Sequence, residues 1–177
     1  ESYEGEGIAY KFIQFQKWNF DITIGNFYDQ FGSGILFRSY FDPNLGVDNS
    51  VNGARVKYRP SSGIDLTAII GKQRNYWDLG EGIIRGFDTQ IYLNDYLFKK
   101  STTIVNLGGS FVTKYQKDND PFFILPENVG AWSGRININK GGWSFESEYA
   151  HKINDPSFTN NYIYKNGNSI IVSGSYS

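Results

Sequence analysis

The stretch Trp18-Asn19-Phe20-Asp21-Ile22-Thr23-Ile24-Gly25 alternates apolar and polar residues with a period of two. Successive side chains of a β-strand point to opposite faces of a sheet, so this alternation predicts a strand with one apolar and one polar face. The same period recurs along most of the chain, whereas helical periodicity is scarce. We therefore expect an all-β protein of about ten antiparallel strands.

The connections between the alternating runs are of two kinds. Short turn signals occur at Pro60-Ser61-Ser62-Gly63, Lys140-Gly141-Gly142 and Asn166-Gly167-Asn168. Longer polar stretches occur at 42–52, 73–81, 116–128 and 153–167, and two less regular runs, 8–16 and 32–41, complete the set of expected strands. Short turns that alternate with longer loops predict an up-and-down meander with two unlike ends. There is no linker and no sharp change of composition, so residues 1–177 are expected to form a single domain.

The two faces of the predicted strands differ in chemistry. The apolar face is expected to carry Trp18, Phe20, Ile22, Ile24, Leu66, Leu107, Phe111, Trp132, Ile136, Trp143 and Phe145. The polar face is expected to carry Asp21, Arg55, Lys57, Arg59, Asp65, Asp88, Arg135, Glu146, Glu148 and Lys152. A transmembrane β-barrel presents an apolar face to lipid and a mixed polar face to its lumen. We therefore expect an antiparallel up-and-down transmembrane β-barrel, in which the first set faces lipid and the second set lines the lumen.

Strand length and the placement of aromatic residues also favour this class. Many runs are about 9–11 residues long, which is the length that a tilted strand needs to cross a bilayer. Aromatic residues near the expected strand ends, such as Tyr58, Trp143 and Tyr176, fit the interfacial girdles of membrane barrels. Alternation alone also fits a soluble antiparallel β-sandwich. A sandwich of the carbohydrate-binding type, with exposed aromatics that bind sugars, remains the alternative.

Composition excludes several functional classes. The 177 residues include 17 Lys+Arg and 18 Asp+Glu, only one His, and no Cys. Without thiols there can be no disulfide, no cysteine–zinc site and no cysteine catalysis, and a single His excludes a multi-histidine zinc site. A near-neutral chain without a basic block gives no electrostatic footprint for nucleic acid. We therefore expect no metal, no cofactor and no nucleic-acid partner.

Several segments, taken together, carry a family resemblance. They are 25–34 (GNFYDQFGSG), 45–50 (LGVDNS), 53–58 (GARVKY), 85–88 (RGFD), 125–129 (LPENV) and 148–156 (EYAHKINDP). This set resembles an uncharacterised family of outer-membrane β-barrel proteins of the Bacteroidota. The resemblance implies a barrel in the outer membrane of a Gram-negative bacterium, in contact with outer-membrane lipid, and implies no established reaction.

The same resemblance bears on whether the barrel closes within this sequence. Proteins that resemble this one are usually considerably longer. The last residues, Ser173-Gly174-Ser175-Tyr176-Ser177, also lack the terminal Phe that is common in barrel-assembly signals. The expectation therefore covers both a barrel that closes within residues 1–177 and one arc of a larger barrel.

Two pairs of residues resemble parts of catalytic sites, but neither pair is expected to be catalytic. Ser147 and His151 are four residues apart on one predicted strand, or about 13 Å, which is too far for a hydrogen bond. Glu146 and Glu148 share a face about 7 Å apart, as the paired carboxylates of glycosidases do, but charge pairing with residues such as Arg135 explains them better. We do not expect an enzyme.

Three other positions carry narrower expectations. The acidic sequence Asp118-Asn119-Asp120 lacks the spacing of a calcium loop and is expected to be a solvated loop. The stretch 42–50 could fold into the lumen as a constriction. Arg85 breaks the apolar parity of its strand, either because it lies at the membrane boundary, where its stem can snorkel, or because the register is shifted by one there.

These expectations lead to two functions without catalysis. One is a channel or porin-like pore with a polar lumen, which would be weakly selective because charges of both signs line it. The other is a structural component whose walls and loops bind other outer-membrane or periplasmic proteins.

Overall fold

A computed structural model of the chain describes residues 8, 10–75, 78–97, 99–157 and 160–177. Within these residues the protein is an all-β structure without an α-helix. The strands of its main sheet are β1 (Phe12–Lys17), β2 (Phe20–Phe27), β5 (Val51–Ser61), β6 (Ile64–Asn75), β7 (Asp78–Tyr92), β8 (Ile104–Tyr115), β9 (Asn128–Lys140), β10 (Trp143–Lys152) and β11 (Gly167–Tyr176). The smaller elements are the hairpin strands β3 (Phe41–Asp42) and β4 (Val47–Asp48) and the 3₁₀ turn η1 (Leu93–Asp95).

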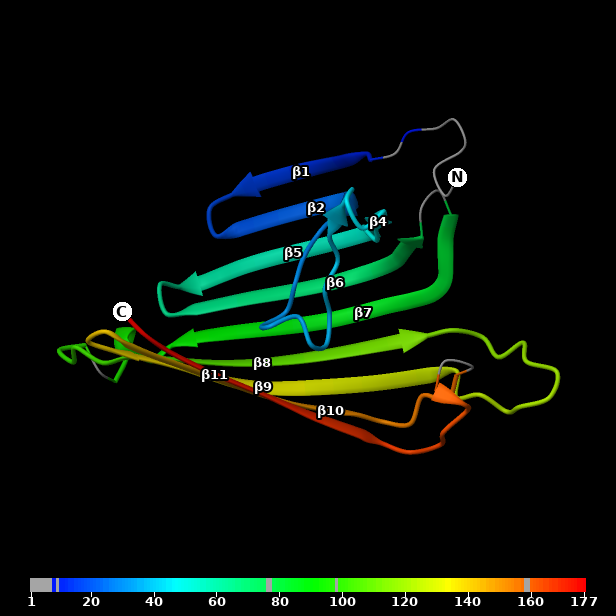
Figure 1. The fold of residues 1–177 in the computed structure, drawn as a ribbon. Coiled ribbons are helices and arrows are strands. Elements are labelled where there is room, and N and C mark those ends of the chain that lie inside the picture. The colour runs from blue at the N-terminus through cyan, green and yellow to red at the C-terminus, as the bar shows by residue number, and fades with distance from the viewer. Residues whose placement is uncertain (1–7, 9, 76–77, 98, 158–159) are drawn as a thin grey trace.

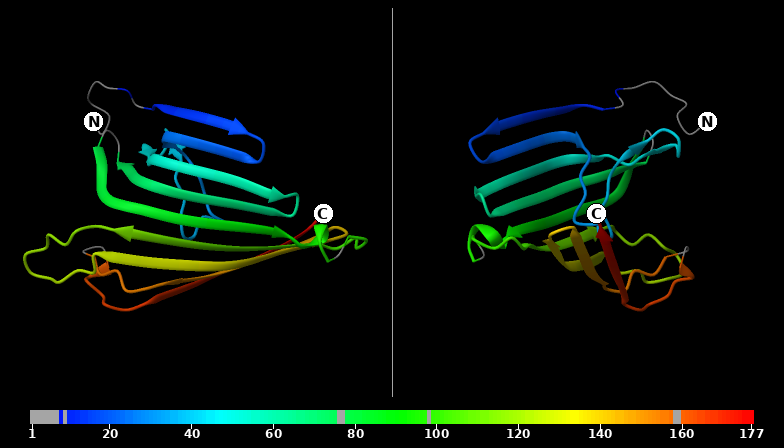
Figure 2. Two further views of the ribbon diagram at one scale, coloured as in Figure 1. Left: turned by 180° about the vertical axis from the view of Figure 1, so that it is seen from behind. Right: turned by 60° about the vertical axis from the view of Figure 1, so that its left-hand side comes forward.

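The main sheet is an antiparallel meander. Its nine strands follow the order β1-β2-β5-β6-β7-β8-β9-β10-β11, so strands that are consecutive along the chain are also neighbours in the sheet. This order confirms the predicted all-β antiparallel sheet. Between the described strands β1 and β11 there is no pairing, and Figures 1 and 2 show a twisted, open sheet rather than a closed barrel.

The run 32–41 was expected to be a strand, and this prediction is wrong. The chain there makes one isolated bridge between Gln30 and Arg38 and then enters the short hairpin β3–β4. Gly32 and Gly34 have φ angles of 51° and 91°, a left-handed conformation that glycine adopts readily and that turns the chain sharply. Alternation in this run therefore reflects a folded loop and not an extended strand.

The stretch 73–81 was expected to be a long loop, and the structure corrects this too. Residues 73–75 continue β6 and residues 78–81 begin β7, whereas residues 76–77 lie outside the described part of the chain. The run 8–16 does contain a strand, β1, which begins at Phe12; residue 9 of that run is not among the described residues. Because residues 73–81 are mostly polar, the sequence pattern did not show that β6 and β7 extend into this stretch.

The two ends of the sheet are unlike. At one end tight turns join β1 to β2, β5 to β6 and β9 to β10. The connections 28–50, 116–127 and 153–166 emerge at the other end (Figure 1). The connection 28–50, called here the inner segment, folds back across one face of the sheet, where Figure 1 shows it in front of β5, β6 and β7. We call the face that it covers the inner face and the opposite one the outer face.

The apolar core is small and lies between the inner segment and the sheet. Its buried members are Phe27, Phe31, Phe37, Val51, Ile69 and Ile84, with Val112 packed at its margin. Because this core lies on the inner face, the apolar side chains of the outer face are not part of it.

Candidate functional site

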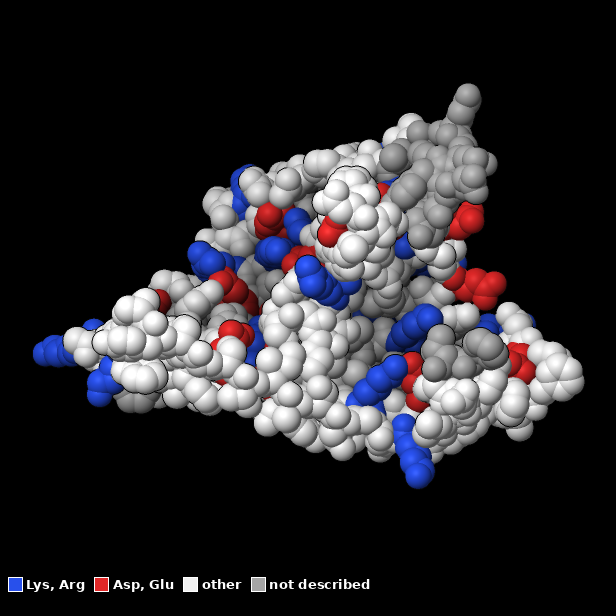
Figure 3. All heavy atoms as spheres, in the orientation of Figure 1, with Lys and Arg blue, Asp and Glu red and all other residues white. Residues whose placement is uncertain are grey.

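Cross-strand register assigns the predicted side chains to the two faces. One row of neighbouring Cα partners runs Asp21, Lys57, Thr67, Asp88, Ser110, Ser133 across six strands. By the same register, the whole set predicted to line a lumen lies on the inner face: Asp21, Arg55, Lys57, Arg59, Asp65, Asp88, Arg135, Glu146, Glu148 and Lys152. Figure 3 shows charges of both signs gathered around the inner segment on this side. That this face borders a lumen stays a prediction.

The residues predicted to face lipid lie on the outer face, apart from Trp18, which sits in the turn between β1 and β2. A continuous row on this face runs Phe15, Ile22, Val56, Ala68, Phe87, Phe111, Trp132. The last three of these side chains are 45%, 51% and 47% exposed. Among the described elements, no helix or strand covers this face (Figure 2). Contact of this face with lipid stays a prediction.

Arg85 is an exposed cation on the largely apolar outer face. It lies between Ile70 on β6 and Thr113 on β8, and the pairing is regular from Ile83 to Tyr92 on the β8 side. The alternative that the register is shifted by one at Arg85 is therefore wrong.

Ion pairs fix the two ends of the inner segment. Near its start, Asp29 lies 3.3 Å from Arg55 and 3.0 Å from Lys57. Near its end, Asp48 pairs with Arg74, and both side chains are buried. Buried charges are stable only when paired, so these contacts hold the segment against the sheet.

The tip of the inner segment is fixed by hydrogen bonds to β9 and β10. Ser33 donates its backbone N–H to Oε2 of Glu148 over 2.8 Å, and the Ser133 hydroxyl donates to Oε1 of the same carboxylate over 2.7 Å. Glu148 is only 1% exposed. A Cβ at Gly32 would lie 2.7 Å from Glu148 Oε2, so only glycine allows this close approach. Glu148 thus serves as an acceptor for the inner segment.

A second buried network lies beside this contact. The Arg135 guanidinium donates to Ser110 Oγ over 2.8 Å, to Asp88 Oδ2 over 3.0 Å and to Gln90 Oε1 over 3.1 Å. Ser110 in turn donates to Asp88 Oδ1 over 2.6 Å. Gly108 makes room for this arrangement, because a Cβ there would lie 2.3 Å from Arg135 Nε. The network ties β7, β8 and β9 together through side chains on the inner face.

The apolar residues on the inner face were not among the site residues predicted from the sequence. The Phe31 ring lies over Gly86, where an added Cβ would be 2.7 Å from the ring and 2.9 Å from Ile69. Ile69 and Ile84 break the polar parity of their strands, and this break is the sequence signal that could have indicated a covered patch. The stretch 42–50, which was expected to fold into a lumen, is the last part of the inner segment, whose Phe31 belongs to the buried apolar cluster. That it constricts a lumen stays a prediction.

Outside the sheet, Tyr10 also packs on the inner segment. Its ring stacks on Tyr28 with centroids 5.3 Å apart. Burial raises the pKa of the Tyr10 hydroxyl above its ordinary value.

A groove of about 490 Å³ opens beside the inner segment, towards the end with the long loops. Its apolar lining comes from Ile35, Leu36 and Phe37 of the inner segment and from Ile84, Val112, Val129, Ala131 and Ala150 of the sheet. Its charged lining comes from Arg38, Lys114, Lys152 and Asp155. This volume is within the range of about 300–1,000 Å³ that is usual for small-molecule sites.

His151, Asp118 and Asp120, which were considered above for chemistry, contact neighbouring residues in the described part of the chain. His151 Nδ1 lies 2.7 Å from Asn168 Oδ1, and its ring lies beside Trp132 on the outer face. Asp118 and Asp120 accept hydrogen bonds from backbone N–H groups of their own loop. No group of three or more potential metal ligands occurs among the described residues. In the same residues there is no helix with the length and apolarity needed to cross a membrane.

These features define a class of protein: an open antiparallel meander with one polar face, covered in part by its own folded-in segment, and one bare apolar face. The chain belongs to DUF6029, a family of unknown function, whose sequence model matches residues 1–177. No curated protein and no solved structure matches the chain.

Proposed function

We propose that this chain forms the wall of a β-barrel in the outer membrane of a Gram-negative bacterium of the Bacteroidota. In this proposal the outer face contacts lipid and the inner face borders a polar lumen. The observation that carries it is the segregation of the two faces: the carboxylates Asp21, Asp65, Asp88, Glu146 and Glu148 all share the inner face. Lipid-facing strands tolerate few charges, whereas a lumen accepts both signs.

The bare outer face counts against a soluble β-sandwich. A sandwich covers the apolar face of one sheet with a second sheet about 10 Å away. Here the only described segment that lies on the sheet covers the polar face instead (Figure 1). A contiguous apolar surface that spans several strands would cause aggregation in water, whereas in a bilayer it is matched to its surroundings. Unpaired strand edges are not tolerated in lipid. In the membrane, the edge strands β1 and β11 would therefore pair with further strands or with each other.

Single-tryptophan variants test contact with lipid. One variant retains Trp132 on the outer face, and a matched variant has all four Trp replaced by Phe and carries Asn137→Trp, on the inner face of the same strand. Both are reconstituted into vesicles whose acyl chains are brominated. We expect strong quenching of Trp132 and weak quenching at position 137. A protein that is monodisperse without detergent and shows equal, weak quenching at both positions would refute the proposal.

Within this barrel the inner segment acts as a constriction. It is held at both ends by ion pairs and at its tip by Glu148, so it narrows the space next to the inner face. We infer a channel of low conductance that widens when these contacts are removed. Single-channel recording in planar bilayers compares the unmodified protein with Asp29→Asn. Asp42→Asn is the control, because Asp42 accepts hydrogen bonds from the backbone of its own hairpin turn and forms no ion pair among the described residues. No conductance in either protein would contradict the channel.

A structural role in an envelope complex is the second candidate, and one observation favours it. At the tip of the loop 116–127, Phe122 and Ile124 are each 88% exposed. The loop is held in shape because Phe123 stacks on Tyr162 and the Tyr164 hydroxyl donates to the carbonyl of Ile124. A rigid apolar tip suits docking to another protein. Cross-linking in native membranes through a photoreactive residue at Phe122 tests this role, and recovery of uncross-linked chain alone would count against it.

A further inference from the structure

The groove beside the inner segment is the uncovered continuation of the apolar patch on the inner face. Phe31 and Phe37 cover Ile69 and Ile84, but the patch continues past them along Val112, Ala131 and Ala150. From Ile84 on β7 to its lining residues on β11 the groove crosses four strand spacings, or about 19 Å. It is therefore long, and the apolar residues named above line its floor.

The charges around the groove are unbalanced. Arg38, Lys114 and Lys152 face one carboxylate, Asp155, which pairs with Lys152. The Arg38 guanidinium lies over the Tyr40 ring at 4.5 Å. Among the described residues, neither Arg38 nor Lys114 forms a salt bridge. The groove thus combines an apolar floor with two cations that have no carboxylate of their own.

We propose that this groove binds a free fatty-acid anion, with its acyl chain along the apolar floor and its carboxylate at Lys114 and Arg38. Each buried methylene contributes about 0.8 kcal/mol, so a chain that spans the groove supplies the affinity. The two cations supply charge-assisted hydrogen bonds that a neutral ligand would lack. This inference goes beyond the proposed function, since the groove is built from the inner segment and the sheet alone.

The experiment measures binding to the full chain held in an amphipathic polymer, a medium that suits membrane and soluble proteins alike. The probes are dodecanoate, dodecanol, which has the same chain without the charge, and acetate, which has the head group alone. Isothermal titration is expected to give saturable binding of one dodecanoate per chain. Dodecanol is expected to bind at least about tenfold more weakly, because a charge-assisted bond contributes roughly 1.5–3 kcal/mol, and acetate is expected not to bind.

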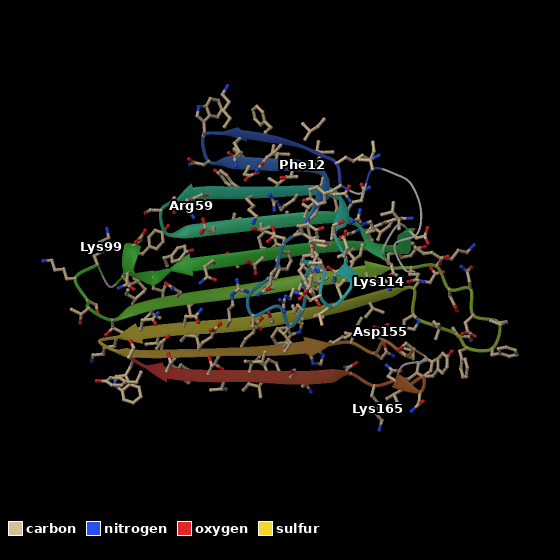
Figure 4. The ribbon with its side chains drawn as sticks, turned by 45° about the horizontal axis from the view of Figure 1, so that its top comes forward. Phe12, Arg59, Lys99, Lys114, Asp155 and Lys165 are labelled. Atoms are coloured by element: carbon tan, nitrogen blue, oxygen red, sulfur yellow. The ribbon has the colours of Figure 1, made fainter. Side chains whose placement is uncertain are left out.

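Two variants locate the site. Lys114→Gln removes the head-group contact and is expected to weaken dodecanoate binding by about tenfold while leaving dodecanol unchanged. Lys99→Gln is the matched control, because Lys99 lies at the opposite end of the sheet from Lys114 (Figure 4). Ala131→Trp fills the groove and is expected to abolish the binding of both long-chain probes.

Three results would overturn the inference: no saturable binding of dodecanoate, equal affinity for dodecanoate and dodecanol, or the same affinity in Lys114→Gln as in the unmodified protein. If Ala131→Trp fails to fold, the comparison of Lys114→Gln with Lys99→Gln still tests whether dodecanoate binds in the groove. Failure of the membrane proposal would appear as a protein that is monodisperse without detergent. That result leaves the binding measurement intact, so the two failures are distinguishable.

Discussion

The backbone N–H of Ser33 donates a 2.8 Å hydrogen bond to Glu148 Oε2, which joins residues 115 positions apart in the sequence. This contact fastens a glycine-flanked tip to the middle of β10. Because Glu148 is almost fully buried, its loss leaves the Ser33 N–H and the Ser133 hydroxyl without an acceptor. This carboxylate therefore helps to hold the tip of the inner segment against the sheet.

Replacing that carboxylate should loosen the tip. Glu148→Ala is expected to cost about 1–3 kcal/mol locally, which corresponds to faster amide exchange at Ser33 by roughly 5- to 150-fold. Hydrogen exchange read by mass spectrometry measures this change over the inner segment. Glu146→Ala is the control, since Glu146 lies on the same strand and face but is only partly buried. Equal effects of the two substitutions would show that the Ser33 contact does not hold the tip.

Phe31 needs the bare backbone of Gly86. Gly86→Ala places a Cβ 2.7 Å from the Phe31 ring and 2.9 Å from Ile69, so the ring must move away from the sheet. We expect a loss of about 1–3 kcal/mol and easier proteolysis within the inner segment. Gly134→Ala is the control, because nothing lies within 4 Å of a Cβ at that position.

A double-mutant cycle separates this clash from a general effect on the strand. Phe31→Leu removes the ring, so Gly86→Ala should cost less in the Phe31→Leu background than alone. A coupling energy of about 0.5 kcal/mol or more is expected for residues in contact. Strictly additive costs would mean that Phe31 and Gly86 do not touch.

Arg135 is the central buried cation of the inner face. Arg135→Gln leaves the partly buried Asp88 without its charge partner and is expected to destabilise the protein by about 3–5 kcal/mol. Lys152→Gln breaks the exposed pair with Asp155 and is expected to cost roughly 0–1 kcal/mol. Urea unfolding followed by tryptophan fluorescence compares the two. Similar midpoints for both variants would contradict the central role of Arg135.

The sheet and the assignment of side chains to its two faces could be predicted from the sequence, because strand periodicity is a local property. Alternation around residues such as Ile22 or Glu148 fixes which way each side chain points once neighbouring strands pair in register. For Arg85 alternation left two explanations open, and the regular pairing of β7 with β8 removes the one that required a shifted register. What alternation cannot show is whether a strand edge finds a partner, and here the described strands β1 and β11 leave the sheet open.

The inner segment was only partly predictable for a different reason. Its contacts join residues far apart in the sequence, such as Asp29 with Lys57 or Ser33 with Glu148, and no local pattern encodes them. The run 32–41 even alternates like a strand, although positive φ angles at Gly32 and Gly34 turn it into a loop. Breaks in polar parity at Ile69 and Ile84 were the available sign that the inner face is covered.

The strongest contrast between a membrane wall and a soluble sheet comes from two adjacent residues of β9. Ile136 lies on the outer face and Asn137 on the inner face, so the same new charge meets two different surroundings. If the outer face contacts lipid, Ile136→Arg is expected to destabilise the inserted protein by about 2–4 kcal/mol, as arginine does near the bilayer midplane. Asn137→Arg is expected to cost much less, because a polar lumen solvates the guanidinium. Unfolding by urea from lipid vesicles measures both. In water an arginine at Ile136 would instead relieve an exposed apolar surface, so a stabilising or neutral Ile136→Arg would contradict the membrane proposal.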